Sequence, residues 1–203
     1  MDNPDFVYGR SVDCLAEKVI TAYVAQGTYV PVGRIEDVYD DILNLGRIFG
    51  VEDRGLELIG SMKQEIGQVH EQIGSVEKPL RVFAFDSGDQ AAFTAGQSLS
   101  SQLIEFAGGK NIFDDIAKSW AEVSWEEVVN RDPEVILIYD YDQPSTEEKI
   151  QFLKNHSALQ NVTAIQNDHF VVLKLSDVFE GVRNTRAVQT MAKAFIRINS
   201  KVS

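Results

Sequence analysis

The stretch Val135–Tyr141 (VILIYDY) is the densest apolar run of the chain and decides the fold class. It is strand-sized and falls well short of the roughly 18 to 20 apolar residues that cross a bilayer. A continuous apolar run of this kind, rich in β-branched residues, is typical of a parallel strand that is buried on both faces. Leu80–Phe85 (LRVFAF) has the same character, so we expect a second buried strand there.

Helical patterns alternate with these strands along the second half of the chain. They are expected at 99–107, 124–131 and 145–155, and the last of these opens with a capping box of Ser145 and Glu148. Further strand material is expected at 163–165 and 169–174, followed by a final helix that includes 188–195. Strands alternating with helices of about ten residues predict β-α-β units, and therefore a mostly parallel, Rossmann-like α/β lobe over 80–203.

The first 79 residues have a different organisation. Strand patterns at 5–8 and 28–32 flank a helical pattern at 12–25, which predicts a β-α-β unit within residues 1–33. Residues 34–79 form a helical linker: apolar residues recur at three- and four-residue spacing from Ile35 to Phe49, and again from Leu56 to about Gly74. The second helix would be a rod of roughly 35 Å, long enough to link two lobes.

The charge balance excludes two classes of partner. Lys and Arg number 19 against 31 Asp and Glu, so the formal net charge is -12. Such a chain repels phosphate backbones and anionic lipid surfaces, so we expect no nucleic-acid partner and no membrane surface. Cys14 is the single cysteine, which rules out an internal disulfide and a thiolate metal cluster.

No motif of nucleophilic or nucleotide chemistry is present in the sequence. The 3 histidines lie far apart and have no helical i, i+4 spacing, so no histidine metal site is expected. Asp86, Asp140 and Asp142 follow strands, where carboxylates can hold a divalent cation. A metal-dependent α/β enzyme or regulatory domain is therefore an alternative function, beside an acidic loop without a ligand and a purely oligomerising scaffold.

Polar and aromatic side chains gather where the predicted strands end. Open α/β sheets bind ligands beyond the carboxyl ends of their strands. Asp86, Ser87 and Thr94 follow the first strand, and Tyr141 follows the second. A small-molecule cleft is therefore expected at this end of the sheet. The segment 176–184, which carries Phe179 and Arg183, follows a third strand and is either a ligand-facing loop of this cleft or a plain strand-to-helix connection.

The segment VSWEEVV contains two neighbouring glutamates with different expected roles. Ser124 and Glu127 are spaced as a capping box, which gives Glu127 a structural role. Glu126 has no such role and is free to project toward solvent or a partner, although an acidic residue in a first turn also compensates the helix dipole. Trp120 and Trp125 lie close by and are able to stack on a flat ligand or to fill the core.

Several motifs in a fixed order resemble one family of transport proteins. PDFVYG at 4–9 and EDVYDDILNLGRIFGVEDRGLELI at 36–59 are followed by FAFDSGDQAAFTAG, LIEFAGGKNIFDD and SWAEVSWEEVVNRDPEVILIYDY. The pattern AGGxNxFxD followed by VSxExxxxxxPExI is the most specific part. The chain is thereby similar to the helical-backbone class of ABC-transporter solute-binding proteins, which serve ferric siderophores, haem and cobalamin, and the resemblance covers almost all of it.

The resemblance implies two α/β lobes joined by a long helix, with an iron complex or a related metal chelate held between them. It implies no catalysis and no cofactor. Glu126 matches a surface glutamate that docks on arginines of the ABC permease. The candidate cleft residues fall where the family lines its ligand site: Asp86, Ser87, Thr94, Trp120, Tyr141, Phe179 and Arg183.

One departure from the family concerns the amino end. Members begin with a signal or lipoprotein peptide and most of an amino-terminal lobe, whereas only Met1–Asn3 precede PDFVYG here. The chain is therefore expected to be an amino-terminally truncated member, whose intact precursor is extracytoplasmic and anchored as a lipoprotein. Residues 1–33 would be a lobe remnant with open strand edges, which a second copy of the chain could cover in a homodimer.

Overall fold

The computed structural model describes residues 22–26, 30 and 32–202. The β-α-β unit expected at 5–32 lies largely outside these residues. The remnant lobe and the homodimer inferred from it therefore stay predictions. No helix within the described ranges has both the length and the apolar character that a membrane crossing requires.

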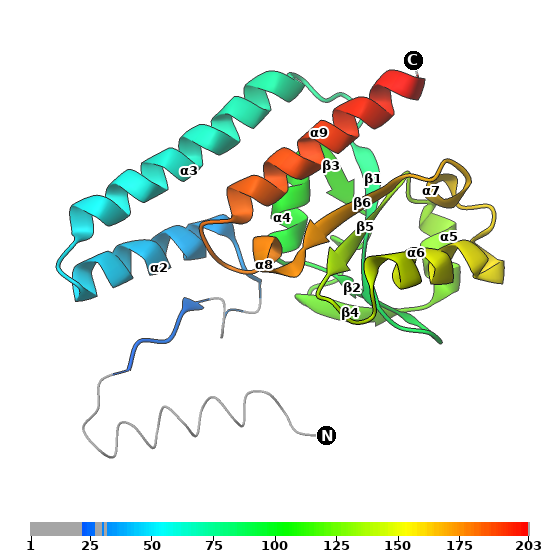
Figure 1. Cartoon of the computed structure of the whole chain (residues 1–203), viewed down its shortest axis with the longest axis horizontal. Helices are drawn as coiled ribbons and strands as arrows, with labels where there is room; N and C mark the ends of the chain where they lie inside the picture. Colours follow the sequence, from blue (N-terminus) through cyan, green and yellow to red (C-terminus); the bar gives the residue numbers. More distant parts are fainter. Residues whose placement is uncertain (1–21, 27–29, 31, 203) are drawn as a thin grey trace.

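Two long helices lead into the sheet domain. Helix α2 (Ile35–Ile48) and helix α3 (Glu52–Ile73) lie side by side and extend away from the sheet (Figure 1). The connection turns at Gly50, which has a φ of 67° in the left-handed region that glycine adopts without strain. Gly55 brings the two helices close, because a Cβ there would lie 3.3 Å from the Ile42 carbonyl oxygen. Both predicted helices are confirmed, and α3 begins four residues earlier than the periodic pattern, at Glu52.

Among the described residues, six strands form a sheet of the order β4-β2-β1-β5-β6, and β3 also pairs with β1. Strand β1 pairs in parallel with β5, which pairs in parallel with β6, as expected from the apolar runs. The other edge of β1 is shared by parallel β3 and antiparallel β2, and β4 continues antiparallel to β2. The strands are β1 (Leu80–Ser87), β2 (Ala92–Ala95), β3 (Gly109–Asn111), β4 (Trp120–Val123), β5 (Val135–Asp140) and β6 (Phe170–Lys174).

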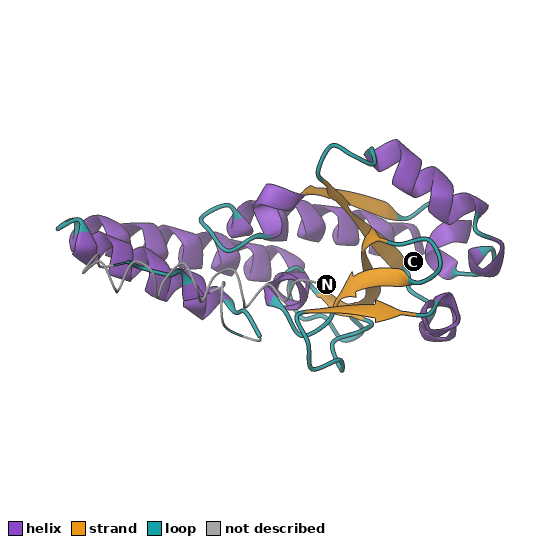
Figure 2. Cartoon of the chain, turned by 90° about the horizontal axis from the view of Figure 1, so that it is seen from below, coloured by secondary structure: helices purple, strands orange, loops and turns teal. Residues whose placement is uncertain are grey.

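Helices cover both faces of the sheet (Figures 1 and 2). One core joins alternate residues of β1 and β5, such as Ala84 and Tyr139, to the helices α2, α3, α4 (Leu99–Phe106), α8 (Leu175–Val178) and α9 (Asn184–Val202). The opposite core joins residues such as Phe85 and Ile138 to α5 (Trp125–Arg131), α6 (Thr146–Asn155), α7 (Thr163–Gln166) and the short η2 (Ser157–Leu159). The mixed, mostly parallel α/β class is confirmed.

The segment predicted as a strand at 163–165 is helix α7 instead. Asp132 accounts for the difference, because its carboxylate accepts hydrogen bonds from Thr163 N at 2.8 Å and from Thr163 Oγ1 at 2.9 Å. The Ala164 amide is also used, since it donates to Pro133 O at 2.9 Å. These contacts hold the first turn of α7 and outweigh the β propensity of Thr and Ile.

Two antiparallel strands and β3 were not predicted. Strands β2 and β4 have four residues each, and β3 has three. Segments of this length with alanine and glycine carry too little periodicity to be recognised. The capping box of Ser145 and Glu148 at the start of α6 is confirmed, with hydrogen bonds of 2.7 and 3.2 Å.

A matched pair of glycine substitutions tests the packing of β3. A Cβ at Gly109 would lie 2.8 Å from Phe195 Cε2 and 2.9 Å from Val82 Cγ2, so Gly109→Ala is expected to lower the free energy of unfolding by about 1–3 kcal/mol. Gly60, in the middle of α3, has no atom within 4 Å of its added Cβ. Gly60→Ala is therefore expected to raise that free energy by up to about 1 kcal/mol.

Urea titration followed by circular dichroism measures both variants. A Gly109→Ala variant as stable as the unmodified chain would contradict the packing of β3 between β1 and α9.

Candidate functional site

The carboxyl ends of β1 and β5 bring Asp86 and Tyr141 together. The two strands are parallel, with Phe85 opposite Ile138, so the residues that follow emerge at one end of the sheet. The Tyr141 hydroxyl donates to the Asp86 carbonyl oxygen at 3.2 Å, and Ser87 Oγ donates to the Asp86 carboxylate at 2.8 Å. Burial, and then the Asp86 charge, raise the pKa of Tyr141, so its phenol is protonated at neutral pH.

An aromatic surface adjoins this pair. Trp120 on β4 stacks on Phe93 on β2, with ring centroids 5.8 Å apart and planes within 16°. Trp120 also contacts the buried Tyr139 edge-on, and both Trp120 and Tyr141 pack on the same core as Tyr139. Phe93 is 39% exposed, and Trp120 and Tyr141 are half-buried. We call Phe93, Trp120, Tyr141 and Asp86 the aromatic edge.

Phe93 is not among the site residues predicted from the sequence. The available signal is its place in Ala92–Ala95 (AFTA), where the residues on either side of it are buried and Phe93 is exposed. Alternation along a strand sends Phe93 and Thr94 to opposite faces. Antiparallel pairing, with Ala95 opposite Trp120 and Phe93 opposite Glu122, then places Phe93 diagonally next to Trp120.

Two candidate residues serve the fold instead. Thr94 is fully buried and its Oγ1 donates to Ala84 O at 2.8 Å, which attaches β2 to β1 and leaves no surface for a ligand. Trp125 is buried against Phe85 and Phe152, and its Nε1 donates to Asp89 O at 2.9 Å. The ligand role expected for Thr94 is therefore wrong, and of the two tryptophans Trp125 belongs to the core.

The loop with Phe179 and Arg183 follows β6 and α8. Because β6 is parallel to β5, it ends at the same side of the sheet as Tyr141. Phe179 is 53% exposed, and the Asn184 side-chain amide donates to Phe179 O at 2.8 Å. Arg183 Nε donates to Ser176 O at 2.9 Å and lies 3.7 Å from the Asp177 carboxylate, so one face of its guanidinium already has partners in the protein.

The three carboxylates considered for a divalent cation do not form one site. No group of three or more His, Cys, Asp or Glu side chains within the described ranges is close enough to hold a metal ion. Asp86 and Asp140 instead share Lys149 as a positive neighbour. Burial lowers the pKa of Lys149, and the charges of Asp86 and Asp140 oppose part of this effect. Asp142 has a left-handed φ of 75°, and its backbone amide donates to the Asp140 carboxylate at 3.5 Å. The metal-dependent alternative has no support in this arrangement.

Glu126 lies exposed in the first turn of α5, on the surface of the domain. Ser124 Oγ accepts from Glu127 N at 3.2 Å, which is one half of the expected capping box. The Glu127 carboxylate takes a different partner, Arg131, at 3.6 Å, and Arg131 also holds down the pKa of Asp115 through a hydrogen bond. Among the described residues, the Glu126 carboxylate has no hydrogen-bond or ion-pair partner, unlike that of Glu127.

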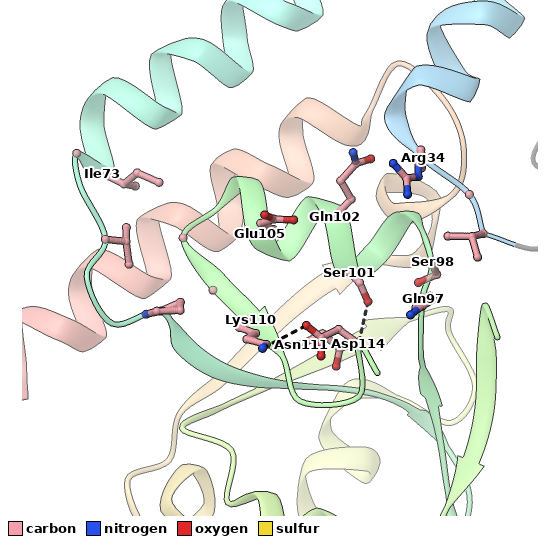
Figure 3. A pocket seen from close by; sticks show the side chains of 17 residues that line it. Arg34, Ile73, Gln97, Ser98, Ser101, Gln102, Glu105, Lys110, Asn111 and Asp114 are labelled. Atoms are coloured by element: carbon pink, nitrogen blue, oxygen red, sulfur yellow. Dashed lines mark hydrogen bonds and ion pairs between the residues drawn. The ribbon is translucent and has the colours of Figure 1, made fainter. Parts of the chain in front are cut away.

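A cavity lies elsewhere in the structure, away from these residues. It has a volume of about 750 Å³ and opens between the start of α2, the end of α3, helix α4 and strand β3 (Figure 3). None of the candidate site residues lines it. Its deepest polar side chain, Asn111, is buried and already donates to Ala95 O and to Ser101 Oγ, both at 2.7 Å. These bonds satisfy the Asn111 amide and join β3 to α4, whereas Ser98 Oγ, which also lines the cavity, is buried without a hydrogen-bond partner in the described part of the chain.

The chain is similar to known binding proteins. A vitamin B12-binding protein of Pectobacterium carotovorum subsp. carotovorum (strain PC1) is 31% identical over 112 residues, covering 54% of this chain and 40% of that protein. The crystal structure of a periplasmic binding protein from Veillonella parvula superposes with a TM-score of 0.84 at 26% identity, covering 90% of this chain and 64% of that one.

The fold recurs in an ABC-type Fe³⁺-hydroxamate transport protein of Saccharomonospora viridis. That structure has a TM-score of 0.77 at 20% identity and covers 96% of this chain and 72% of that one. The chain spans about half the length of the curated relatives it matches. Residues 12–176 match the family model described as periplasmic binding protein, which is most of the sequence. The chain therefore belongs to the periplasmic binding protein family.

Proposed function

We propose that this chain is the substrate-binding component of an ABC importer. Its ligand would be a metal chelate, either an iron complex or a corrinoid. The protein would bind this ligand outside the cytoplasm and deliver it to the membrane permease. The family supports the transport role, and the relatives named for vitamin B12 and for Fe³⁺-hydroxamate support the ligand class. The protein would carry its ligand unchanged, without catalysis and without a cofactor.

The aromatic edge is the observation that carries this proposal. Phe93 and Trp120 stack on one another, and Phe93 lies opposite Ser87 at the carboxyl end of β1. At the same end of the sheet the Tyr141 hydroxyl donates to the Asp86 carbonyl oxygen. Planar or apolar parts of a chelate would stack on the rings, and polar parts would contact Asp86 and Ser87. Phe179 and Arg183 would contribute from the loop after β6.

Glu126 would dock the protein on the permease. An exposed carboxylate without a partner on the protein pays little desolvation when it meets an arginine, and a bidentate pair of this kind also fixes orientation. The neighbouring acidic residues Glu127 and Asp115 are less available, because both contact Arg131.

Truncation of the exposed ring tests the ligand site. Phe93→Ala is expected to weaken the binding of cyanocobalamin or ferrichrome, measured by isothermal titration calorimetry, roughly tenfold, because it removes half of the stacked surface. Phe49→Ala is the control, since Phe49 is 73% exposed at the far end of α2.

Equal affinities for the unmodified chain and Phe93→Ala would place the ligand elsewhere. Absence of binding of either chelate would contradict the proposed function itself.

Charge reversal tests docking. Glu126→Arg is expected to weaken association with a vitamin B12 ABC transporter in lipid nanodiscs at least tenfold, because an attractive contact becomes a repulsive one. Glu147→Arg is the matched control, since Glu147 is likewise exposed in the first turn of a serine-capped helix, α6.

Surface plasmon resonance at two salt concentrations measures both variants. The attraction between Glu126 and the permease, which Glu126→Arg removes, is the part of the binding that added salt should weaken. Similar losses in the two variants, or no association of the unmodified chain, would contradict a specific docking role for Glu126.

A further inference from the structure

We propose that Lys149 is a positioning residue of the aromatic edge, which holds the ring of Tyr141 in one orientation before any ligand arrives. Lys149 lies in the first turn of α6, and only 3% of it is exposed. Its Nζ donates to Tyr139 O at 2.7 Å and lies 3.5 Å from the centroid of the Tyr141 ring. One ammonium group therefore connects the end of β5 to the aromatic ring that follows it.

The location of this lysine is costly, which argues for a specific role. A buried ammonium loses its hydration, and a cation in the first turn of a helix also meets the positive end of the helix dipole. Three features offset these costs: the Tyr139 carbonyl oxygen, the electron-rich face of Tyr141, and the nearby carboxylates of Asp86 and Asp140. Lys154, farther along the same helix, avoids the cost of burial, because its ammonium pairs with the exposed Asp168 carboxylate at 2.6 Å.

Tyr141 is held at two points. Lys149 contacts the face of its ring, and its hydroxyl donates to Asp86 O at 3.2 Å. Lys149 is fixed in turn, because the Ser145–Glu148 capping box defines the first turn of α6 and the Lys149 amide donates to Ser145 O at 3.0 Å. A ring that is already ordered loses little conformational entropy when a ligand packs on it, so affinity rises without a direct contact between Lys149 and the ligand.

The consequence for affinity rests on the proposed function, whereas the positioning of Tyr141 does not. The two are therefore measured separately. The chain is labelled with 3-fluorotyrosine, and the ¹⁹F resonance of Tyr141 is assigned by its loss in Tyr141→Phe. Lys149→Met, which keeps the apolar stem, is expected to shift and broaden this resonance, and Lys154→Met is expected to leave it unchanged. An unchanged Tyr141 resonance in Lys149→Met would overturn the proposal.

A measurement on the unmodified chain keeps the test decisive if Lys149→Met does not fold. The face of Tyr141 should shift the ε-methylene protons of Lys149 to high field through its ring current, and Tyr141→Leu should abolish the shift. Random-coil values in the unmodified chain would contradict the contact.

A double-mutant cycle measures the effect on affinity. With Tyr141 present, Lys149→Met should weaken cyanocobalamin binding by about tenfold. In a Tyr141→Ala background the same substitution should leave binding unchanged, because Lys149 acts through that ring. An equal loss in both backgrounds would mean that Lys149 acts through general stability or touches the ligand itself. If no chelate binds, the ¹⁹F result still decides the positioning role, and only the proposed function fails.

Discussion

The parallel pairing of β1 with β5 is the constraint on which the rest of the structure depends. Four successive residue pairs, from Val82 opposite Val135 to Phe85 opposite Ile138, join two strands that are buried on both faces. A slip of one residue would exchange the two cores, so the register is strongly specified. The same register brings Asp86 and Tyr141 to one end of the sheet, and it therefore positions the candidate site as well as the fold.

The antiparallel strands β2 and β4 extend this framework in a different way. They pair outside β1 and carry the stacked rings of Phe93 and Trp120 toward the end of the sheet where the parallel strands stop. Two buried residues support this arrangement. Thr94 attaches β2 to β1, and Trp125 packs against Phe85. Alternation along β2 thus separates the buried Thr94 from the exposed Phe93, whereas Trp125 is buried because it lies in helix α5 against the opposite face of the sheet.

The sequence predicted what depends on long, regular patterns. The two helices of 35–73 follow from apolar periodicity, and the parallel strands β1, β5 and β6 follow from short runs rich in apolar residues. What it missed depends on contacts between distant segments: the hydrogen bonds of Asp132 that make 163–166 helical, the diagonal pairing that exposes Phe93 beside Trp120, and the burial of Lys149 under Tyr141. Lysine is a surface residue by default, so nothing local to 145–155 indicates a buried ammonium there.

The two indole N–H groups provide the most direct test of the central claim that a chelate binds on the aromatic edge. The chain has 2 tryptophans, Trp120 on that edge and Trp125 in the opposite core, so a ¹⁵N–¹H correlation spectrum reports on both at once. Titration with cyanocobalamin, or with the diamagnetic gallium form of a hydroxamate siderophore, should shift the Trp120 indole resonance and leave that of Trp125 in place. A shift confined to Trp125, or no change in either resonance at saturating ligand, would contradict the account.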